Sequence, residues 1–367
     1  MARSSKKVFI AAGGTGGHVF PGIAVARELM RIDPSVEIKF AGTPRGLETE
    51  IVPGFGWPLI LFGSHSIKDK GGAGKVAALV RLPFSVLHAI AVLISDRPDL
   101  VVGIGGYAAA PLIFAAWLLR IPIVLVEPNA IPGMTNRKLG RMAKRIFVAF
   151  DEAKGYFAKD KAVLTGAPIR TEVAEAVRGD GEASGLRTLF VFGGSQGART
   201  LNLAMKSAAG ELGNIGKGMR VIHQTGRSAD PAEISGAYSD AGLKAEVMPF
   251  CDRIWDCYGK ADLVVARAGA NTVAELAAVG IPSILVPYPH AADDHQRANA
   301  MALVRAGAAR LVDDSECTGE RMAREIADLF GNPSRLQEMA RGAKSVGHPD
   351  AARTIAKECM DIMKTDH

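Results

Sequence analysis

The chain alternates short apolar runs, glycine turns and helical patterns. The run KKVFIAA (residues 6–12) leads into glycines, and HVFPGIAVARELMR (18–31) follows with the spacing of an amphipathic helix. The same order recurs at residues 99–119 and 187–209, each time as a β-branched run, a glycine turn and a helix. Such repeated strand, loop and helix units predict an α/β fold with a parallel sheet.

Stretches of the first half recur in the second half in the same order, which indicates a duplicated α/β unit. They are DLVV at 99–102 and 262–265, I-P-x-I/V-L-V at 121–126 and 281–286, and the glycine loops that open at Gly13 and Gly193. We therefore predict two doubly wound parallel-sheet domains that face each other across a cleft. The pattern lapses between residues 165–170 and the polar, glycine-rich stretch 179–185, so the division is expected there.

The amino-acid composition agrees with two globular domains, and the cysteines indicate a reducing compartment. The chain has 367 residues, of which 48% are hydrophobic and 22% charged, enough for two globular cores. Its four cysteines form no C-x-x-C pair and no zinc-type spacing, so they are expected as reduced thiols without a structural metal. The apolar run at 8–12 is too short for a signal peptide, and the longest run, 108–119, is too short to span a bilayer.

The net charge of +6 allows phosphates, nucleic acid or an anionic membrane as partners. Nucleic acid is the least supported of these, because aromatic residues are only 6% and are not interleaved with a basic stretch. We therefore expect no nucleic-acid partner.

The glycine loops suit phosphate, because a glycine turn before a helix exposes backbone N–H groups at the positive end of the helix dipole. A rival interpretation rests on residues 103–108, which fit the dinucleotide pattern G-x-G-x-x-A, followed by Glu127 at the end of the next predicted strand. An NAD-dependent oxidoreductase therefore stays an alternative. The other two loops do not fit that pattern.

Three polar groups beside the loops have both a functional and a plain structural interpretation. His18 is suited to general-base work or is simply a residue at a helix N-terminus. Glu275 either accepts hydrogen bonds from a ribose diol or is a carboxylate favoured by the helix dipole. The cluster at 290–295 contains acidic and histidine side chains, yet the chain has no D-x-D, and Asp293 and Asp294 equally suit a helix cap. We expect no required metal.

Four ordered motifs, GGTGGHVFPG, GIGGYAAAP, GGSQGARTLN and RAGANTVAELAAVGIP, closely resemble those of the MurG family, bacterial enzymes that add N-acetylglucosamine to lipid I. The resemblance covers nearly the whole chain. It implies a GT-B fold of two Rossmann-like domains, with residues 1–169 for the acceptor and the membrane, 170–349 for the UDP-sugar, and a last helix at 350–367 that packs back on the first domain.

The resemblance implies an inverting transfer of GlcNAc from UDP-GlcNAc to the C4 hydroxyl of MurNAc in lipid I, a step of peptidoglycan synthesis that needs no cofactor. It implies a peripheral enzyme at the cytoplasmic face of the bacterial inner membrane. Another UDP-sugar enzyme of the same fold, such as an epimerase, stays a second alternative.

The resemblance also assigns roles to residues. His18 and Glu127 are candidate bases that the sequence does not rank, and backbone N–H groups of the 193–197 turn would stabilise the departing diphosphate. The expected substrate-binding residues are Thr15, Gly16, Gly17, Asn129, Arg170, Ser195, Gln196, Cys251, Ala270, Asn271, Thr272, Val273, Ala274, Glu275 and Gln296. The chain departs from the family pattern at Val126, Pro128, Ala167, Cys251 and His295. At Cys251 the implied uracil contact is made through the backbone.

Basic and apolar residues meet in the segment 67–94, where Lys75, Arg81, Leu82 and Phe84 form a composition suited to an anionic bilayer surface. Periodicity alone favours an ordinary core-packing helix. The resemblance favours membrane docking, because the acceptor of the family is anchored in a membrane.

Overall fold

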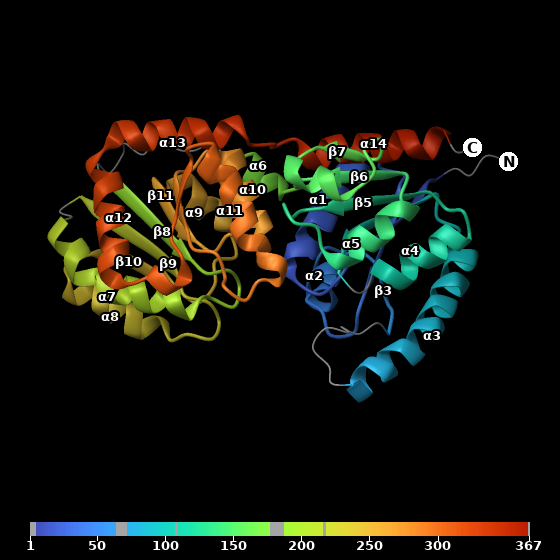
Figure 1. The fold of residues 1–367 in the computed structure, drawn as a ribbon, viewed down its shortest axis with the longest axis horizontal. Coiled ribbons are helices and arrows are strands. Elements are labelled where there is room, and N and C mark those ends of the chain that lie inside the picture. The colour runs from blue at the N-terminus through green and yellow to red at the C-terminus, as the bar shows by residue number, and fades with distance from the viewer. Residues whose placement is uncertain (1–4, 64–71, 107–108, 177–186, 216–217, 366–367) are drawn as a thin grey trace. The chain divides into compact units, whose positions relative to one another are not determined.

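The computed structural model describes residues 5–63, 72–106, 109–176, 187–215 and 218–365, and the side chains of 72–82 and 215 are also outside the description. The chain divides into two compact units. The first comprises the chain up to Arg170 together with the stretch from Asp350 onward, and the second comprises Thr171–Pro349. Each unit is built on its own parallel sheet (Figure 1).

The sheet of the first unit has seven strands in the order β3-β2-β1-β4-β5-β6-β7. The strands are β1 (Lys7–Ala12), β2 (Glu37–Gly42), β3 (Leu59–Leu61), β4 (Leu100–Gly105), β5 (Ile123–Glu127), β6 (Arg145–Val148) and β7 (Ala162–Leu164). The helices are α1 (Gly16–Ile32), α2 (Glu48–Gly54), α3 (Gly72–Asp96), α4 (Ala109–Leu118), α5 (Met134–Leu139) and α14 (Ala351–Thr365), with 3₁₀ turns η1 (Gly140–Met142) and η2 (Asp151–Tyr156).

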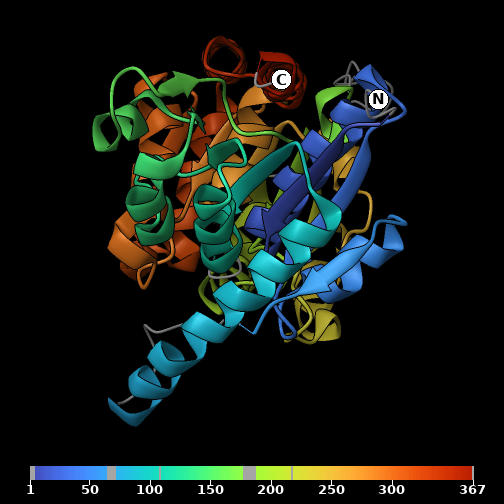
Figure 2. The same cartoon turned by 90° about the vertical axis from the view of Figure 1, so that its right-hand side faces the viewer.

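The side chains of alternate residues of β1 pack on opposite faces of this sheet, as the two-residue period of a strand requires. Val8 and Ile10 belong to the core that contains α1 and α14, while Phe9 and Ala11 belong to the core that contains α3 and α4. The last helix, α14, therefore completes the first unit although it ends the chain. Figure 2 shows α3 running across this unit, with its first turns extending beyond the sheet.

The sheet of the second unit has six strands in the order β10-β9-β8-β11-β12-β13. The strands are β8 (Arg187–Phe192), β9 (Met219–Gln224), β10 (Lys244–Met248), β11 (Leu263–Ala266), β12 (Ser283–Leu285) and β13 (Ala309–Leu311). The helices are α6 (Thr171–Ala174), α7 (Arg199–Ile215), α8 (Pro231–Asp240), α9 (Ile254–Lys260), α10 (Ala270–Val279), α11 (His295–Arg305), α12 (Gly319–Gly331) and α13 (Pro333–Ser345), with 3₁₀ turns η3 (Ala292–Asp294) and η4 (Asp314–Glu316).

The repeated DLVV sequence performs the same structural task in both units. Asp99 accepts a hydrogen bond from the backbone N–H of Lys7 at 2.7 Å, and Asp262 accepts one from Thr188 at 2.8 Å. Each aspartate thereby joins the start of the fourth strand of its unit in chain order to the start of the first strand beside it. The predicted α/β fold with two parallel sheets is confirmed. Within the described part of the chain, no helix combines the length and apolarity that crossing a bilayer requires.

Candidate functional site

The first glycine loop connects β1 to α1 at the carboxyl edge of the sheet. Gly14 has φ +103°, a left-handed conformation that glycine adopts without strain. Thr15 precedes the first turn of α1, and its carbonyl accepts the N–H of His18 at 3.0 Å. Gly16 and Gly17 open the helix, so their N–H groups lie at its positive end. This geometry suits an anionic or polar ligand.

A buried carboxylate that sequence reasoning missed holds this loop. Glu48 at the start of α2 is 0% exposed, and it accepts the N–H of Gly14 at 2.8 Å and the N–H of Thr43 at 2.7 Å. Any Cβ on Gly46 would lie 1.9 Å from the Glu48 carboxylate. Glu48 therefore joins the loops after β1 and β2, and the glycine beside it makes the space.

The second glycine loop, after β4, packs against the first. Gly105 and Gly106 have φ of +119° and +80°. A Cβ on Gly105 would lie 3.1 Å from Cδ2 of His18, and one on Gly106 would lie 2.4 Å from the carbonyl oxygen of Gly13. The missing side chains let the imidazole of His18 rest on the second loop. The last residues of the dinucleotide pattern, 107 and 108, lie outside the described residues.

Glu127 ends β5 with its carboxylate buried and surrounded by donors. It accepts the backbone N–H of Asn129 at 2.9 Å, the side-chain amide of Asn129 at 3.2 Å, the N–H of Gly133 at 3.1 Å and the amide of Asn136 at 2.9 Å. Burial raises the pKa of Glu127 to about 7, and these hydrogen bonds oppose the shift. The carboxylate closes the loop that follows β5 and positions Asn129 within it.

Arg170, the last residue of the first unit, lies against α1. Its guanidinium is 4.9 Å from the centre of the Phe20 ring, a cation–π distance.

The third glycine loop follows β8 in the second unit. Gly194 and Gly197 have φ of +90° and +79°. A Cβ on Gly197 would lie 2.1 Å from the carbonyl oxygen of Thr225, so the loops after β8 and β9 touch backbone to backbone. Ser195 and Gln196 occupy the exposed tip of the loop. The third loop is thus a turn with a polar tip that packs closely against the loop after β9.

A second missed residue, Gln224, connects this loop to Cys251. The side chain of Gln224 is 2% exposed; its Nε2 donates to the Gly194 carbonyl at 3.0 Å and its Oε1 accepts the N–H of Cys251 at 3.1 Å. The side-chain amide of Gln224 therefore links the glycine loop at 193–197 to the segment at Cys251, two segments for which the family resemblance implies contacts with UDP. Nothing in the sequence around Gln224 distinguishes it from any polar residue at a strand end.

The segment from Ala270 to Glu275 forms the beginning of α10. Glu275 is buried, and the hydroxyl of Tyr258 donates to its Oε2 at 2.9 Å. Asn271, Thr272 and Ala274 are half-buried, whereas Val273 points into the core. A carboxylate oriented by a tyrosine in this way is better defined than a surface carboxylate stabilised only by the helix dipole.

The polar cluster at 290–296 is organised by local hydrogen bonds. Asp294 stands at the N-cap of α11 without a side-chain cap bond, His295 bonds through Nδ1 to the Ala292 carbonyl at 2.7 Å, and Gln296 accepts the N–H of Tyr288 at 3.0 Å. Among the residues that the structure describes, no three His, Cys, Asp or Glu side chains gather as metal ligands would.

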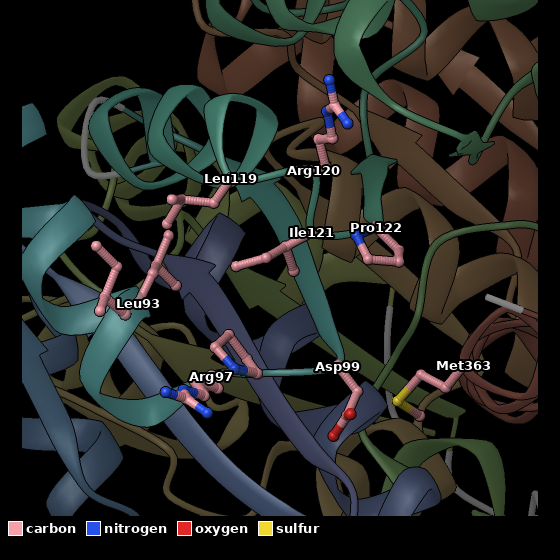
Figure 3. A pocket seen from close by; sticks show the side chains of 10 residues that line it. Leu93, Arg97, Asp99, Leu119, Arg120, Ile121, Pro122 and Met363 are labelled. Atoms are coloured by element: carbon pink, nitrogen blue, oxygen red, sulfur yellow. The ribbon is translucent and has the colours of Figure 1, made fainter. Parts of the chain in front are cut away.

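A pocket of about 400 Å³ lies at the other edge of the first sheet, away from the glycine loops. Figure 3 shows that its lining comes from the ends of α3 and α4, the starts of β4 and β5, and Met363 of α14. Because ligands of such sheets bind beyond the carboxyl ends of the strands, this pocket is not the predicted site.

Of the residues predicted to dock on a membrane, Phe84 is described, and its side chain is 69% exposed on α3. Lys75, Arg81 and Leu82 belong to the same helix, but their side chains lie outside the described residues.

Comparison with known proteins identifies the family. The glycosyltransferase family 28 N-terminal domain matches residues 8–148, and the family 28 C-terminal domain matches residues 188–355. A protein of Myxococcus xanthus named "UDP-N-acetylglucosamine--N-acetylmuramyl-(pentapeptide) pyrophosphoryl-undecaprenol N-acetylglucosamine transferase" is 44% identical over 357 residues, which cover 97% of this chain and 93% of the relative. The chain belongs to the MurG family. A similarly named protein of Geobacter sulfurreducens is 42% identical, covering 96% of this chain and 97% of its own.

Solved structures agree with this family. MurG of Acinetobacter baumannii matches with a TM-score of 0.82 and 32% identity, covering 97% of this chain and 99% of that one. A UDP-GlcNAc 2-epimerase from Neisseria meningitidis matches with a TM-score of 0.68 at 14% identity, which shows a common fold alone. Membership of the MurG family confirms the predicted resemblance, the GT-B fold class and the glycosyltransferase assignment. The oxidoreductase and epimerase alternatives are not favoured.

Proposed function

We propose that this protein transfers N-acetylglucosamine from UDP-GlcNAc to the C4 hydroxyl of the MurNAc sugar of lipid I, with inversion at the anomeric carbon. The observation that carries the proposal is identity of 44% over 97% of the chain with a relative whose name states the donor, UDP-N-acetylglucosamine, and the acceptor, N-acetylmuramyl-(pentapeptide) pyrophosphoryl-undecaprenol. The C4 hydroxyl and the inversion are what the family resemblance implies. The glycine loops that resemble those of the family follow β1, β4 and β8, at the carboxyl ends of the strands, where ligands of such folds bind.

The first unit binds the acceptor in this proposal, and His18 is its base. The imidazole removes the proton of the attacking C4 hydroxyl as that oxygen bonds to the anomeric carbon and the bond to UDP breaks. The closeness of Gly105 and Gly106 to the ring supports this role, because the glycine loop after β4 packs against the imidazole. Glu127 is assigned a positioning role, since both of its oxygens already accept hydrogen bonds from the loop at 129–136.

The second unit binds the donor. Ser195 and the backbone N–H groups of the 193–197 turn stabilise the negative charge that grows on the leaving diphosphate. Glu275, oriented by Tyr258, accepts hydrogen bonds from the ribose hydroxyls, and Gln296 contacts the donor sugar. The remaining donor contacts are assigned to Gln196, the backbone at Cys251, the start of α10 at 270–274, and Asn129 and Arg170 of the first unit.

Docking on the cytoplasmic face of the inner membrane completes the proposal. Large apolar side chains are exposed on α3 and on the adjoining α4, namely Phe84, Leu87, Ile94, Trp117 and Leu118. Aromatic and aliphatic side chains beside basic residues favour the interface of an anionic bilayer. Arg81→Glu combined with Phe84→Ser is expected to weaken co-sedimentation with anionic liposomes, whereas unchanged binding would contradict docking through this face.

The transfer itself is tested with labelled UDP-GlcNAc and a short-chain lipid I analogue, in the presence of EDTA and with UDP-GalNAc as the competing donor. Transfer that survives EDTA and prefers the gluco donor is the expected result. If UDP-GlcNAc binds but no transfer occurs, the proposed acceptor is wrong. If no UDP-sugar binds, the proposed donor is wrong as well.

A further inference from the structure

Two of the cysteines lie side by side in the second unit. Cys251, in the loop after β10, is half-buried, and Cys257 of α9 is almost fully buried. Their sulfur atoms are 3.1 Å apart, within about 1 Å of the length of a disulfide bond. The other cysteines, Cys317 and Cys359, are buried elsewhere in the protein.

The surroundings make the two thiols unequal. The thiol of Cys257 donates to the sulfur of Cys251, and the backbone N–H of Arg253 donates to the same sulfur, so the pKa of Cys251 is lowered. Burial of the thiol opposes this shift, as do the carboxylates of Asp256 and Asp252. The hydrogen bond to Cys251, together with burial, raises the pKa of Cys257. Cys251 is therefore the more nucleophilic and more accessible sulfur, and Cys257 is positioned to react with it.

We propose that Cys251 and Cys257 form a redox-active pair, which a peroxide converts reversibly into an intramolecular disulfide that alters the 193–197 glycine loop. The Cys251 thiolate attacks one peroxide oxygen, which yields a sulfenic acid and hydroxide. The Cys257 sulfur then attacks the Cys251 sulfur, its proton and the sulfenic hydroxyl leave as water, and the S–S bond forms. Overall, two thiols are oxidised and one peroxide is reduced to two waters.

The path from this pair to the glycine loop consists of two hydrogen bonds. The N–H of Cys251 donates to Gln224, and Gln224 donates to the carbonyl of Gly194. Closing the S–S bond draws Cys251 and α9 together, which changes the position of the N–H that Gln224 accepts. Because Gln224 is buried between the two segments, a displacement of Cys251 is transmitted to Gly194.

The first test requires no assumption about the substrate. The full-length protein is treated with hydrogen peroxide, digested without reduction, and mapped by mass spectrometry before and after dithiothreitol. The expected product is a cross-link between Cys251 and Cys257, lighter than the two thiols by two hydrogen atoms and reversed by dithiothreitol. Hydrogen–deuterium exchange of the 193–197 amides is expected to rise in the cross-linked protein and to return to its initial rate after reduction.

Matched variants separate the pair from general oxidation. Cys251→Ser and Cys257→Ser each abolish the cross-link and the change in exchange, whereas Cys317→Ser leaves both as in the wild type. Peroxide-treated protein that carries only sulfinic acids or intermolecular links overturns the proposal. A Cys251–Cys257 cross-link with unchanged exchange at 193–197 overturns its second half.

The kinetic consequence rests on the proposed function. In the transfer assay, oxidation is expected to raise KM for UDP-GlcNAc about fivefold, the order expected for one weakened hydrogen bond. Dithiothreitol restores KM, and the Cys257→Ser enzyme is expected to lack the rise in KM that the disulfide produces. If the reduced protein transfers no sugar, the proposed function fails, while the cross-link and the exchange data still decide the redox pair.

Discussion

The two units use the same sheet architecture but hold their ligand-facing loops by different chemistry. At the amino ends of the strands, Asp99 and Asp262 make the same bond to the neighbouring strand. At the carboxyl ends, buried carboxylates hold the loops of the first unit, Glu48 and Glu127, whereas the neutral amide of Gln224 holds those of the second. The hydrogen bonds at the strand starts stabilise the fold and are the same in both units. The loops face the ligands and are anchored differently, by the carboxylates Glu48 and Glu127 in the first unit and by the neutral amide of Gln224 in the second.

The largest expected effect comes from comparing the His18→Ala and Ser195→Ala enzymes, one variant in each unit. We expect His18→Ala to lower kcat by roughly 10²–10⁴-fold, because a general base acts on the chemical step, and to leave KM for UDP-GlcNAc unchanged. Ser195→Ala is expected to lower kcat only about fivefold, because one hydrogen bond to the charge on the leaving diphosphate is lost while the backbone N–H groups of the 193–197 turn remain. Steady-state kinetics measure both. A His18→Ala enzyme with near-wild-type kcat would remove the imidazole from the proposed chemistry.

The backbone contact between the loops of the second unit is tested by Gly197→Ala. The new Cβ would lie 2.1 Å from the Thr225 carbonyl oxygen at a φ of +79°, so we expect the free energy of unfolding to fall by about 2–4 kcal/mol. The control is Gly210→Ala in α7, where a Cβ meets nothing within 4 Å and helix propensity adds about 0.5–1 kcal/mol. Urea unfolding followed by circular dichroism compares them. Equal stability of the two variants would mean that the loops separate easily.

The carboxylate anchor of the first unit is tested by Glu48→Gln. An amide in place of one carboxylate oxygen faces an N–H donor, so we expect a loss of about 2 kcal/mol in the free energy of unfolding. Glu50→Gln, on the exposed side of the same helix, is the control and is expected to change stability by less than about 0.5 kcal/mol. Similar losses in the two variants would show that Glu48 contributes no more than a surface residue.

The two units are also expected to respond to pH in opposite directions. The pKa of Glu127 is raised from 4.5 to about 7, so the folded state binds its proton more tightly and stability from this group is lost as pH rises from 4.5 to 7. In the second unit, burial lowers the pKa of His223 from 6.5 to about 4, so stability is lost as pH falls from 6.5 to 4. Each group contributes a slope of at most about 1.4 kcal/mol per pH unit.

Urea unfolding at several pH values separates these two slopes. Glu127→Gln is expected to remove the loss toward neutral pH, and His223→Gln to remove the loss toward acid. A wild-type slope in both variants between pH 4.5 and 6.5 would mean that other groups dominate the titration.

The sequence predicted the α/β class and its parallel sheets well, because those features follow from local rules. A β-branched run before a glycine turn and a helix is readable within about 25 residues, and the order of four motifs carried the family. The sequence also placed His18 at the start of a helix after a glycine loop and Ser195 on a glycine loop. It could not rank His18 against Glu127, since the partners of Glu127 only become visible when residues 129–136 fold around it.

By itself, the sequence determined the alternation of strands and helices, the duplicated unit, the glycine loops and membership of the MurG family, because each depends on neighbouring residues or on ordered motifs. Only the tertiary structure decided that Glu48 and Gln224 hold the loops, that Gly105 makes room for His18, and that Cys251 meets Cys257. The physical reason is that a hydrogen bond or a close contact depends on distance in space, and folding brings together side chains whose separation along the chain carries no such signal.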